Sequence, residues 1–424
     1  MSRRLTAAAL VWLGAAGLAS AAPPAPSVRM TFRQAIARAM QQNPSVQQAA
    51  QVILQAQALL RQATSVILPS VDGSVTNATL NTGVTFNGEV AQPQNQTTLS
   101  VSVTQLLYAP VQWAERTQAA DNERVARLGE VNVKREVAVA TAEAYLAIIA
   151  SRRVYQADVT ARDTAKAHYD LAHEQLVAGA GSRLDELRAR QALSSDEVLV
   201  ADAAMNVYRA QEALGVLLAV DHPVDTDGEP TLDLPTSLQT AESDMAGARA
   251  DLRLAAAQEQ AATRVYDDSW KDRLPSVSSV FTPQDITPVS FFQKSKSWRL
   301  TLEAAIPIFD SGLRSAEKAQ RLAALDQTKI ARNADLRQAR SDVRTAEAAV
   351  ASAGQALTAA RAAAEQAREV VRITDISFKA GASTDIEVID AQQASLDADT
   401  AAAQAEDQLR QAKLALLVAL GQFP

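Results

Sequence analysis

Long stretches of the chain carry hydrophobic residues at intervals of seven, which is the spacing of a coiled coil. Residues 313–379 contain one glycine, Gly354, and no proline. One seam of apolar positions repeats every seven residues, and a second seam of alanines follows it by three residues. The members are Leu336, Val343, Val350, Leu357, Ala364 and Val371, followed by Ala339, Ala346, Ala353, Ala360 and Ala367. A strict repeat of 3.5 residues per turn predicts a long helix in a left-handed coiled coil.

Glycine interrupts the helical pattern at Gly179 and again at Gly381, and a helical pattern resumes after each. A glycine at this place is typical of a left-handed helix end. The sequence therefore predicts two long helical hairpins and two shorter helices. The predicted helices span about 31–67, 110–178 and 182–220, then 244–273, 312–380 and 384–421.

Before each long helix the pattern changes to strict alternation. Leu99, Val101 and Val103 alternate with polar residues, and the same holds for the stretch from Trp298 to Ala304. Period-two alternation predicts strands with one apolar and one polar face. A partner strand begins at a proline before each of these stretches, at Pro69 and at Pro275. We therefore expect β-hairpins over about 69–108 and 275–308.

The same motifs occur twice. Leu68-Pro69-Ser70-Val71 returns as Leu274-Pro275-Ser276-Val277, and Gly179-Ala180 returns as Gly381-Ala382. Such repetition indicates a tandem duplication and a pseudo-symmetric architecture. The predicted repeats span 23–220 and 244–424, and a loop over 221–243 joins them.

Composition restricts the compartment and the partners. Two arginines, an apolar run and a small-residue site predict a signal peptide over 1–22, and hence a cell-envelope protein. No later run is apolar for 18 residues, as a membrane helix needs. The chain has no cysteine, so it forms no disulfide. Its net charge of −7, with both signs interspersed, argues against nucleic acid as a partner.

Four amphipathic strands cannot close a membrane barrel, so the pattern calls for several copies. The chain resembles TolC-like outer-membrane efflux channels over essentially its whole mature length. The resemblance lies in residues 30–44, both Leu-Pro-Ser-Val motifs, residues 308–312 and residues 379–384. It implies a mixed, mainly α fold. Three copies would form a twelve-stranded barrel in outer-membrane lipid and a periplasmic helical tunnel. The implied partners are a periplasmic adaptor and an inner-membrane transporter.

We therefore expect a passive exit duct for small molecules such as drugs or metals. A protein-secretion duct of the same fold is one alternative, and a periplasmic coiled-coil scaffold or adhesin outside the membrane is another. No pattern indicates an enzyme or a cofactor. His168 and His173 lie five residues apart, a poor spacing for two metal ligands on one helical face.

Two acidic residues are candidates for the tunnel entrance. Glu387 and Asp390 are three residues apart and so share one helical face. By spacing alone they form a solvated acidic face. The resemblance implies instead that three copies form two carboxylate rings that attract cations at a closed periplasmic entrance.

The resemblance also points to residues that close the entrance. Asp185 matches a position that holds neighbouring hairpins together, but the arginine often found after the second glycine is Ser383 here. Phe378 stands where an aromatic hydroxyl is common, and Arg183 is either a substitute cation or a plain surface residue. We expect the contacts that close the entrance to be weaker than in the resembling channels, or to involve other residues.

The residues of the two hairpin turns have small, unreactive side chains, which suits a tight turn. The resemblance implies that they also dock the adaptor. The residues are Ala178, Gly179, Ala180, Gly181, Gly381, Ala382 and Ser383.

Overall fold

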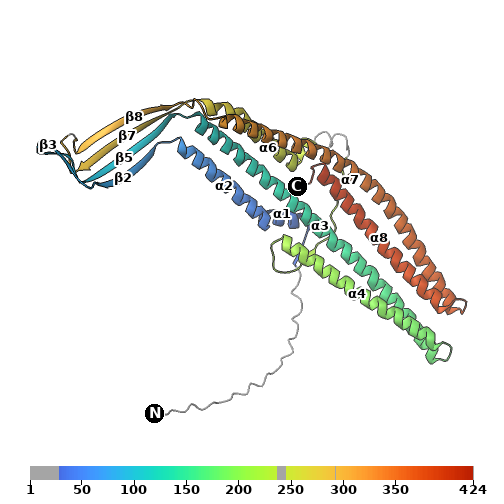
Figure 1. Cartoon of the computed structure of the whole chain (residues 1–424). Coiled ribbons are helices and arrows are strands. Elements are labelled where there is room, and N and C mark those ends of the chain that lie inside the picture. Colours follow the sequence, from blue (N-terminus) through green and yellow to red (C-terminus); the bar gives the residue numbers. More distant parts are fainter. Residues whose placement is uncertain (1–27, 236–244, 292, 424) are drawn as a thin grey trace, which may run out of the picture.

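The computed structural model describes residues 28–235, 245–291 and 293–423. The predicted signal peptide at 1–22 and the end of the predicted loop at 221–243 lie outside these residues. The described chain is elongated, with a sheet at one end and the tips of two helical hairpins at the other (Figure 1). None of the helices in the described ranges combines the length and apolarity that a membrane crossing requires.

Each half contains a pair of long strands and a pair of long helices. The elements of the first half are β1 (Val28–Met30), α1 (Phe32–Gln42), α2 (Pro44–Val66), β2 (Ser70–Thr79), β3 (Val84–Phe86), β4 (Glu89–Gln92), β5 (Asn95–Tyr108), α3 (Pro110–Val177), α4 (Arg183–Leu217) and β6 (Val224–Thr226). Those of the second half are α6 (Ala250–Asp267), a 3-10 helix (Asp268–Arg273), β7 (Ser276–Thr287), β8 (Lys296–Ala305), α7 (Leu313–Lys379) and α8 (Asp385–Ala419).

The predicted coiled-coil seams are the buried faces of α7. Ala339 and Val343 are fully buried, and Leu357 and Ala364 are buried further along the helix. Helix α7 packs along α8, and α3 packs along α4 (Figure 1). At about 1.5 Å per residue, the 68 residues of α3 extend roughly 100 Å. The burial of both seams confirms the heptad prediction for α7.

The four long strands form one antiparallel sheet in the order β2-β5-β7-β8. Residues that pair directly across strands share a face of the sheet. One such row crosses all four strands and is apolar; it consists of Val71, Val103, Phe281 and Leu300. Three of its members are at least 40% exposed, so none of the described residues covers this face.

The opposite face of the sheet is polar. A second row across all four strands consists of Ser74, Ser100, Gln284 and Ser297. The hydroxyls of Ser74 and Ser100 lie 2.8 Å apart, and the Gln284 amide donates to Ser297 Oγ at 3.1 Å. The prediction of strands with one apolar and one polar face is confirmed.

The main hydrophobic core lies midway along the molecule, where α1, α3, α4 and the end of α8 meet. Tyr145, Leu146 and Leu214 are fully buried in it. The Tyr145 hydroxyl reaches the carbonyl oxygen of Gly228 at 2.9 Å and thereby ties α3 to the loop after α4. This core anchors both hairpins at their middle and leaves the tips to depend on local contacts.

The prediction of one continuous helix over 31–67 is wrong, because α1 and α2 meet at Asn43. Asn43 is extended, with φ −62° and ψ 133°. The ring of Pro44 disfavours a helical conformation in the residue before it. Asn43 compensates by capping α2 through a bond from the Ser45 N–H and by donating to the Leu217 carbonyl, both at 2.9 Å.

The predicted helix over 244–273 is also interrupted. Arg249 is extended, and α6 begins only at Ala250. The nearly buried guanidinium of Arg249 bonds to Asp251 and to Asp342 of α7, and these bonds hold the chain in the interrupted conformation. Residues 268–273 tighten into a 3-10 helix before Leu274, which is extended because Pro275 follows it.

One small element lies in a region predicted as a loop. Strand β6, within the predicted loop at 221–243, pairs in parallel with β1. Each strand has three residues, which is too short for an alternating pattern to be visible in the sequence.

Candidate functional site at the hairpin tips

The two hairpin tips have the same backbone. Gly179 has φ 77° and Gly381 has φ 73°, a region that side-chain-bearing residues disfavour. At the first tip the N–H groups of Gly179 and Ala180 reach back to Leu176 and Gln175. The second tip repeats both bonds, from Gly381 to Phe378 and from Ala382 to Ser377. Each turn is thus a Schellman motif, as the glycine positions predict.

The returning helices begin at hydroxyl caps. The Ser182 side chain accepts from the Leu184 N–H at 3.1 Å, and the Thr384 side chain accepts from the Glu387 N–H at 3.4 Å. In the second tip the Glu387 carboxylate also accepts from the Thr384 N–H at 2.8 Å and from Ser383 Oγ at 2.6 Å. This reciprocal arrangement is a capping box. Thr384-x-x-Glu387 is a readable signal for it that sequence analysis missed.

The two predicted ring residues both lie on the exposed surface of α8. Glu387 is exposed beside the turn, and Asp390 is exposed one turn further on. The Ser383 hydroxyl and the Thr384 N–H bond to the carboxylate and lower the pKa of Glu387. Glu387 therefore keeps its negative charge to lower pH than an ordinary glutamate.

The predicted gate residues fall into two separate groups. Asp185 lies 3.8 Å from Arg188 on its own helix, whereas Arg183 bonds to Glu186 and not to Asp185. The ring of Phe378 packs edge-on against His168 with the ring centroids 5.2 Å apart. The structure thus joins Phe378 to a histidine that was not among the predicted gate residues.

Two histidine–carboxylate pairs near the tips were missed by sequence reasoning. His168 Nε2 and Asp385 Oδ1 are 2.7 Å apart, and both side chains are at most 3% exposed. His173 Nδ1 and Glu186 Oε1 are 2.8 Å apart, and His173 is half exposed. The partners are 217 residues apart in the first pair and 13 in the second. His168 and His173 thus have separate partners.

The environments of the two carboxylates differ. Burial raises the pKa of Asp385, although the bond from His168 opposes this. The bond from His173, helped by Arg183, lowers the pKa of Glu186. Among the described residues, no group of three or more His, Asp or Glu side chains is placed to hold a metal ion.

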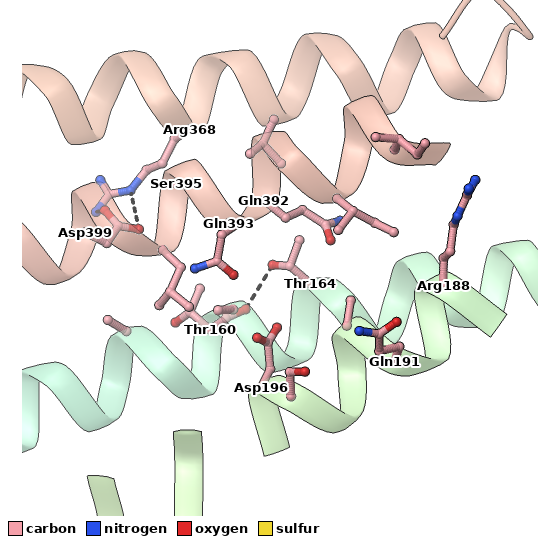
Figure 2. A pocket seen from close by; sticks show the side chains of 18 residues that line it. Thr160, Thr164, Arg188, Gln191, Asp196, Arg368, Gln392, Gln393, Ser395 and Asp399 are labelled. Carbon is pink, nitrogen blue, oxygen red and sulfur yellow. Dashed lines mark hydrogen bonds and ion pairs between the residues drawn. The ribbon is translucent and has the colours of Figure 1, made fainter. Parts of the chain in front are cut away.

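A groove of about 440 Å³ separates the two hairpins above their tips. It is lined by residues of α3, α4, α7 and α8. Figure 2 shows Gln191 and Asp196 of α4 on one side and Gln392 and Gln393 of α8 on the other. Arg368 bonds to Asp399 at its α7–α8 wall. The groove is open and its lining is mixed, with polar side chains beside apolar ones such as Val371 and Ile389. The two hairpins are therefore not packed together along their whole length.

Residues 35–220 and 243–422 match the family model described as outer membrane efflux protein. The matched spans cover most of the chain and both halves of the duplication. The chain therefore belongs to the outer membrane efflux protein family. This confirms the predicted resemblance and the mainly α fold, and it favours an outer-membrane efflux channel over the scaffold and secretion alternatives. The family is a class of channels and not of enzymes.

Solved channels share the fold. The CmeC outer membrane channel of Campylobacter jejuni superposes with a TM-score of 0.80 at 18% identity, covering 92% of this chain and 85% of that one. The outer membrane protein VceC of Vibrio cholerae gives 0.77 at 17%, covering 92% and 96%. The MtrE channel of Neisseria gonorrhoeae, solved in its open state, gives 0.77 at 19%, covering 92% and 88%. Comparison with curated proteins finds no match.

Proposed function

We propose that three copies of this chain assemble into the passive exit duct of a tripartite efflux pump. The observation that carries the proposal is the open sheet. Strands β2 and β8 each pair on one side, and one face of the sheet is apolar and uncovered. Unpaired strand edges are costly in lipid, and closing the sheet on itself removes them. Three sheets of four strands supply twelve, enough to close a barrel.

The helical hairpins would continue the barrel as a tunnel through the periplasm. Their tips lie at the far end of the molecule from the sheet (Figure 1). Ala178, Gly179, Ala180, Gly381 and Ala382 are exposed there, and Gly181 and Ser383 are half-buried. Small exposed side chains let another protein approach the backbone closely. This supports the tips as the docking surface of a periplasmic adaptor, with an inner-membrane transporter supplying the energy.

Glu387 and Asp390 would form carboxylate rings at the tunnel entrance. Their exposure within one chain and the low pKa of Glu387 support this role, because charged rings hold cations. Asp185, Arg183 and Phe378 would contribute contacts that close the entrance. The duct performs no covalent chemistry and takes no cofactor. Its cargo would be small toxic molecules such as drugs or metals.

The duct is tested with the purified full-length protein. We expect extraction only with detergent, a trimer whose migration changes on heating, and discrete conductance steps in a planar bilayer. A monomer that is extracted without detergent and never conducts would overturn the proposal.

The rings are tested by cation block in the same bilayers. In the double variant Glu387→Gln and Asp390→Asn, we expect block by divalent cations to weaken by about tenfold or more, since two rings of charge are removed. Glutamine at 387 preserves the capping box. The matched control is Asp397→Asn, an exposed acidic residue further along α8. Block that is equal in the double variant and the wild type would contradict the ring assignment.

A further inference from the structure

One buried polar bond joins the two hairpins of a chain near their tips. His168 belongs to α3 in the first hairpin, and Asp385 is the first residue of α8 in the second. Their 2.7 Å bond lies at the tipward end of the groove. Thr164, one helical turn from His168, and Ile386, next to Asp385, both line that groove. The bond therefore closes the gap between hairpins at the end where an entrance would open.

The pair is buried more deeply than ordinary surface ion pairs. Both side chains are at most 3% exposed, and Phe378 of α7 covers the imidazole. His168 Nδ1 and Asp385 Oδ2 have no hydrogen-bond partner among the described residues. The bond between the two residues is thus the main compensation for burying them. Removing one partner would leave the other unsatisfied in a place that excludes water.

The second histidine pair provides an internal comparison. His173 and Glu186 form a bond of nearly equal length, but both belong to the first hairpin. Breaking it does not release one hairpin from the other. The two pairs therefore separate the effect of losing a histidine–carboxylate bond from the effect of losing a link between hairpins.

We propose that His168 and Asp385 form a latch that joins the two helical hairpins of each chain and holds the periplasmic entrance closed. The latch rests on the proposed role of the tips as the entrance of the duct. Opening would separate the two side chains and expose both to water.

The stability of the latch depends on pH, because the His168–Asp385 pair can lose a proton. With one titratable proton the buried pair is neutral overall, whichever residue carries the proton. Loss of that proton leaves a buried carboxylate bonded to a neutral imidazole. Of the charged groups around it, Asp185 of α4 disfavours this state and Arg188 of α4 favours it. On α7, Asp375 and Lys379 bond to each other at 2.7 Å.

The direction of the effect follows from Asp385. Its pKa is raised in this structure, mainly by burial, so burying the Asp385 carboxyl favours uptake of a proton. A raised pKa stabilises the closed latch at low pH, and this contribution is lost as pH rises through the raised value. Lower pH should therefore favour the closed entrance, and higher pH the open one.

The test is the open fraction of single trimers in planar bilayers, measured from the ordinary aspartate pKa of about 4 up to about pH 8. Wild-type protein should open more as pH rises. His168→Asn should open about tenfold more often than wild type at the acidic end, because it leaves Asp385 without its partner. Asp385→Asn keeps a hydrogen-bonding side chain but removes the titratable carboxyl, so its open fraction should depend less on pH than that of the wild type.

The control is His173→Asn, which should follow the wild-type pH profile. Circular dichroism and trimer migration establish that each variant folds. If His168→Asn and Asp385→Asn keep the profile of His173→Asn while the wild type conducts, the latch alone is overturned. A wild-type protein that never conducts overturns the duct and the latch together.

Discussion

The two hairpin tips have the same backbone conformation, and they differ in what their charged side chains contact. The long helices have 68 and 67 residues, the returning helices have 35 each, and both turns are Schellman motifs. The residue after the hydroxyl cap is Arg183 in the first tip and Asp385 in the second. Arg183 is exposed and bonds within its own hairpin, whereas Asp385 is buried and bonds to the other hairpin.

This difference shows how a duplicated chain can retain shape and still specialise. The turn geometry is set by glycine and by backbone bonds, so both copies keep it. The side chain one residue past the cap is free of that constraint, because its contacts depend on what lies opposite. In the first copy the charge remains local, and in the second it links the two halves of the chain.

The largest effect should come from the equivalent positions 183 and 385. Asp385→Ala should lower the free energy of unfolding by about 1–3 kcal/mol, since it leaves the buried His168 imidazole unpaired. Arg183→Ala should cost clearly less, because its guanidinium is exposed and its buried partner Glu186 keeps the bond to His173. Denaturant unfolding of the detergent-solubilised protein measures both. Equal losses at the two positions would contradict the contrast between the tips.

A smaller and symmetric effect is expected at the turn glycines. Gly179→Ala and Gly381→Ala should each cost about 1–2 kcal/mol, because alanine is strained at a positive φ. A new Cβ at either position meets open space, so backbone strain is the whole cause. The same unfolding measurement applies. A loss at one tip without the other would show that the two turns differ in backbone after all.

The helix caps should contribute slightly less. Ser182→Ala and Thr384→Ala should each cost about 1 kcal/mol through loss of a capping bond. We expect the loss at Thr384 to be the larger, because the substitution also leaves Glu387 with half of its capping box. Thermal unfolding followed by circular dichroism checks the order, and a larger loss at Ser182 would refute it.

The smallest difference concerns pH. The depressed pKa of Glu387 stabilises the fold above the ordinary glutamate pKa, and this contribution is lost as pH falls through the depressed value. Wild type should therefore exceed Glu387→Gln in melting temperature near neutral pH, and the two should converge in acid. Asp185→Asn, at the equivalent place in the first tip, is the control, because Asp185 forms no capping box with Ser182. A difference that persists in acid would exclude the capping carboxylate as its cause.

Much of the architecture could be predicted because its physics is local. The heptads around Val343 and the alternation around Leu99 follow from one element burying one face. The break at Asn43 and the capping box at Thr384 also have local signals in the sequence, namely an Asn-Pro step and a T-x-x-E motif.

The latch could not be predicted in this way. His168 and Asp385 are 217 residues apart, and their meeting depends on how two long coiled coils lie against each other. A shift of one turn would separate them, and no local pattern specifies that register. Glu387, Asp390 and the tip residues remain predictions as functional sites, because their roles depend on neighbouring chains.

The most direct test of the link between the hairpins is the separation of their tips. The chain contains no cysteine, so Ala180→Cys and Ala382→Cys, both at exposed positions, place one spin label on each tip. Trimers are assembled from a few labelled chains and an excess of unlabelled ones. Double electron–electron resonance then reports the distance between the two tips of a single chain. With His168 and Asp385 intact, we predict a short, narrow distance distribution in acid that lengthens and broadens as pH rises, and a long distribution at every pH in the Asp385→Ala background. Identical distributions in the two backgrounds would contradict the account.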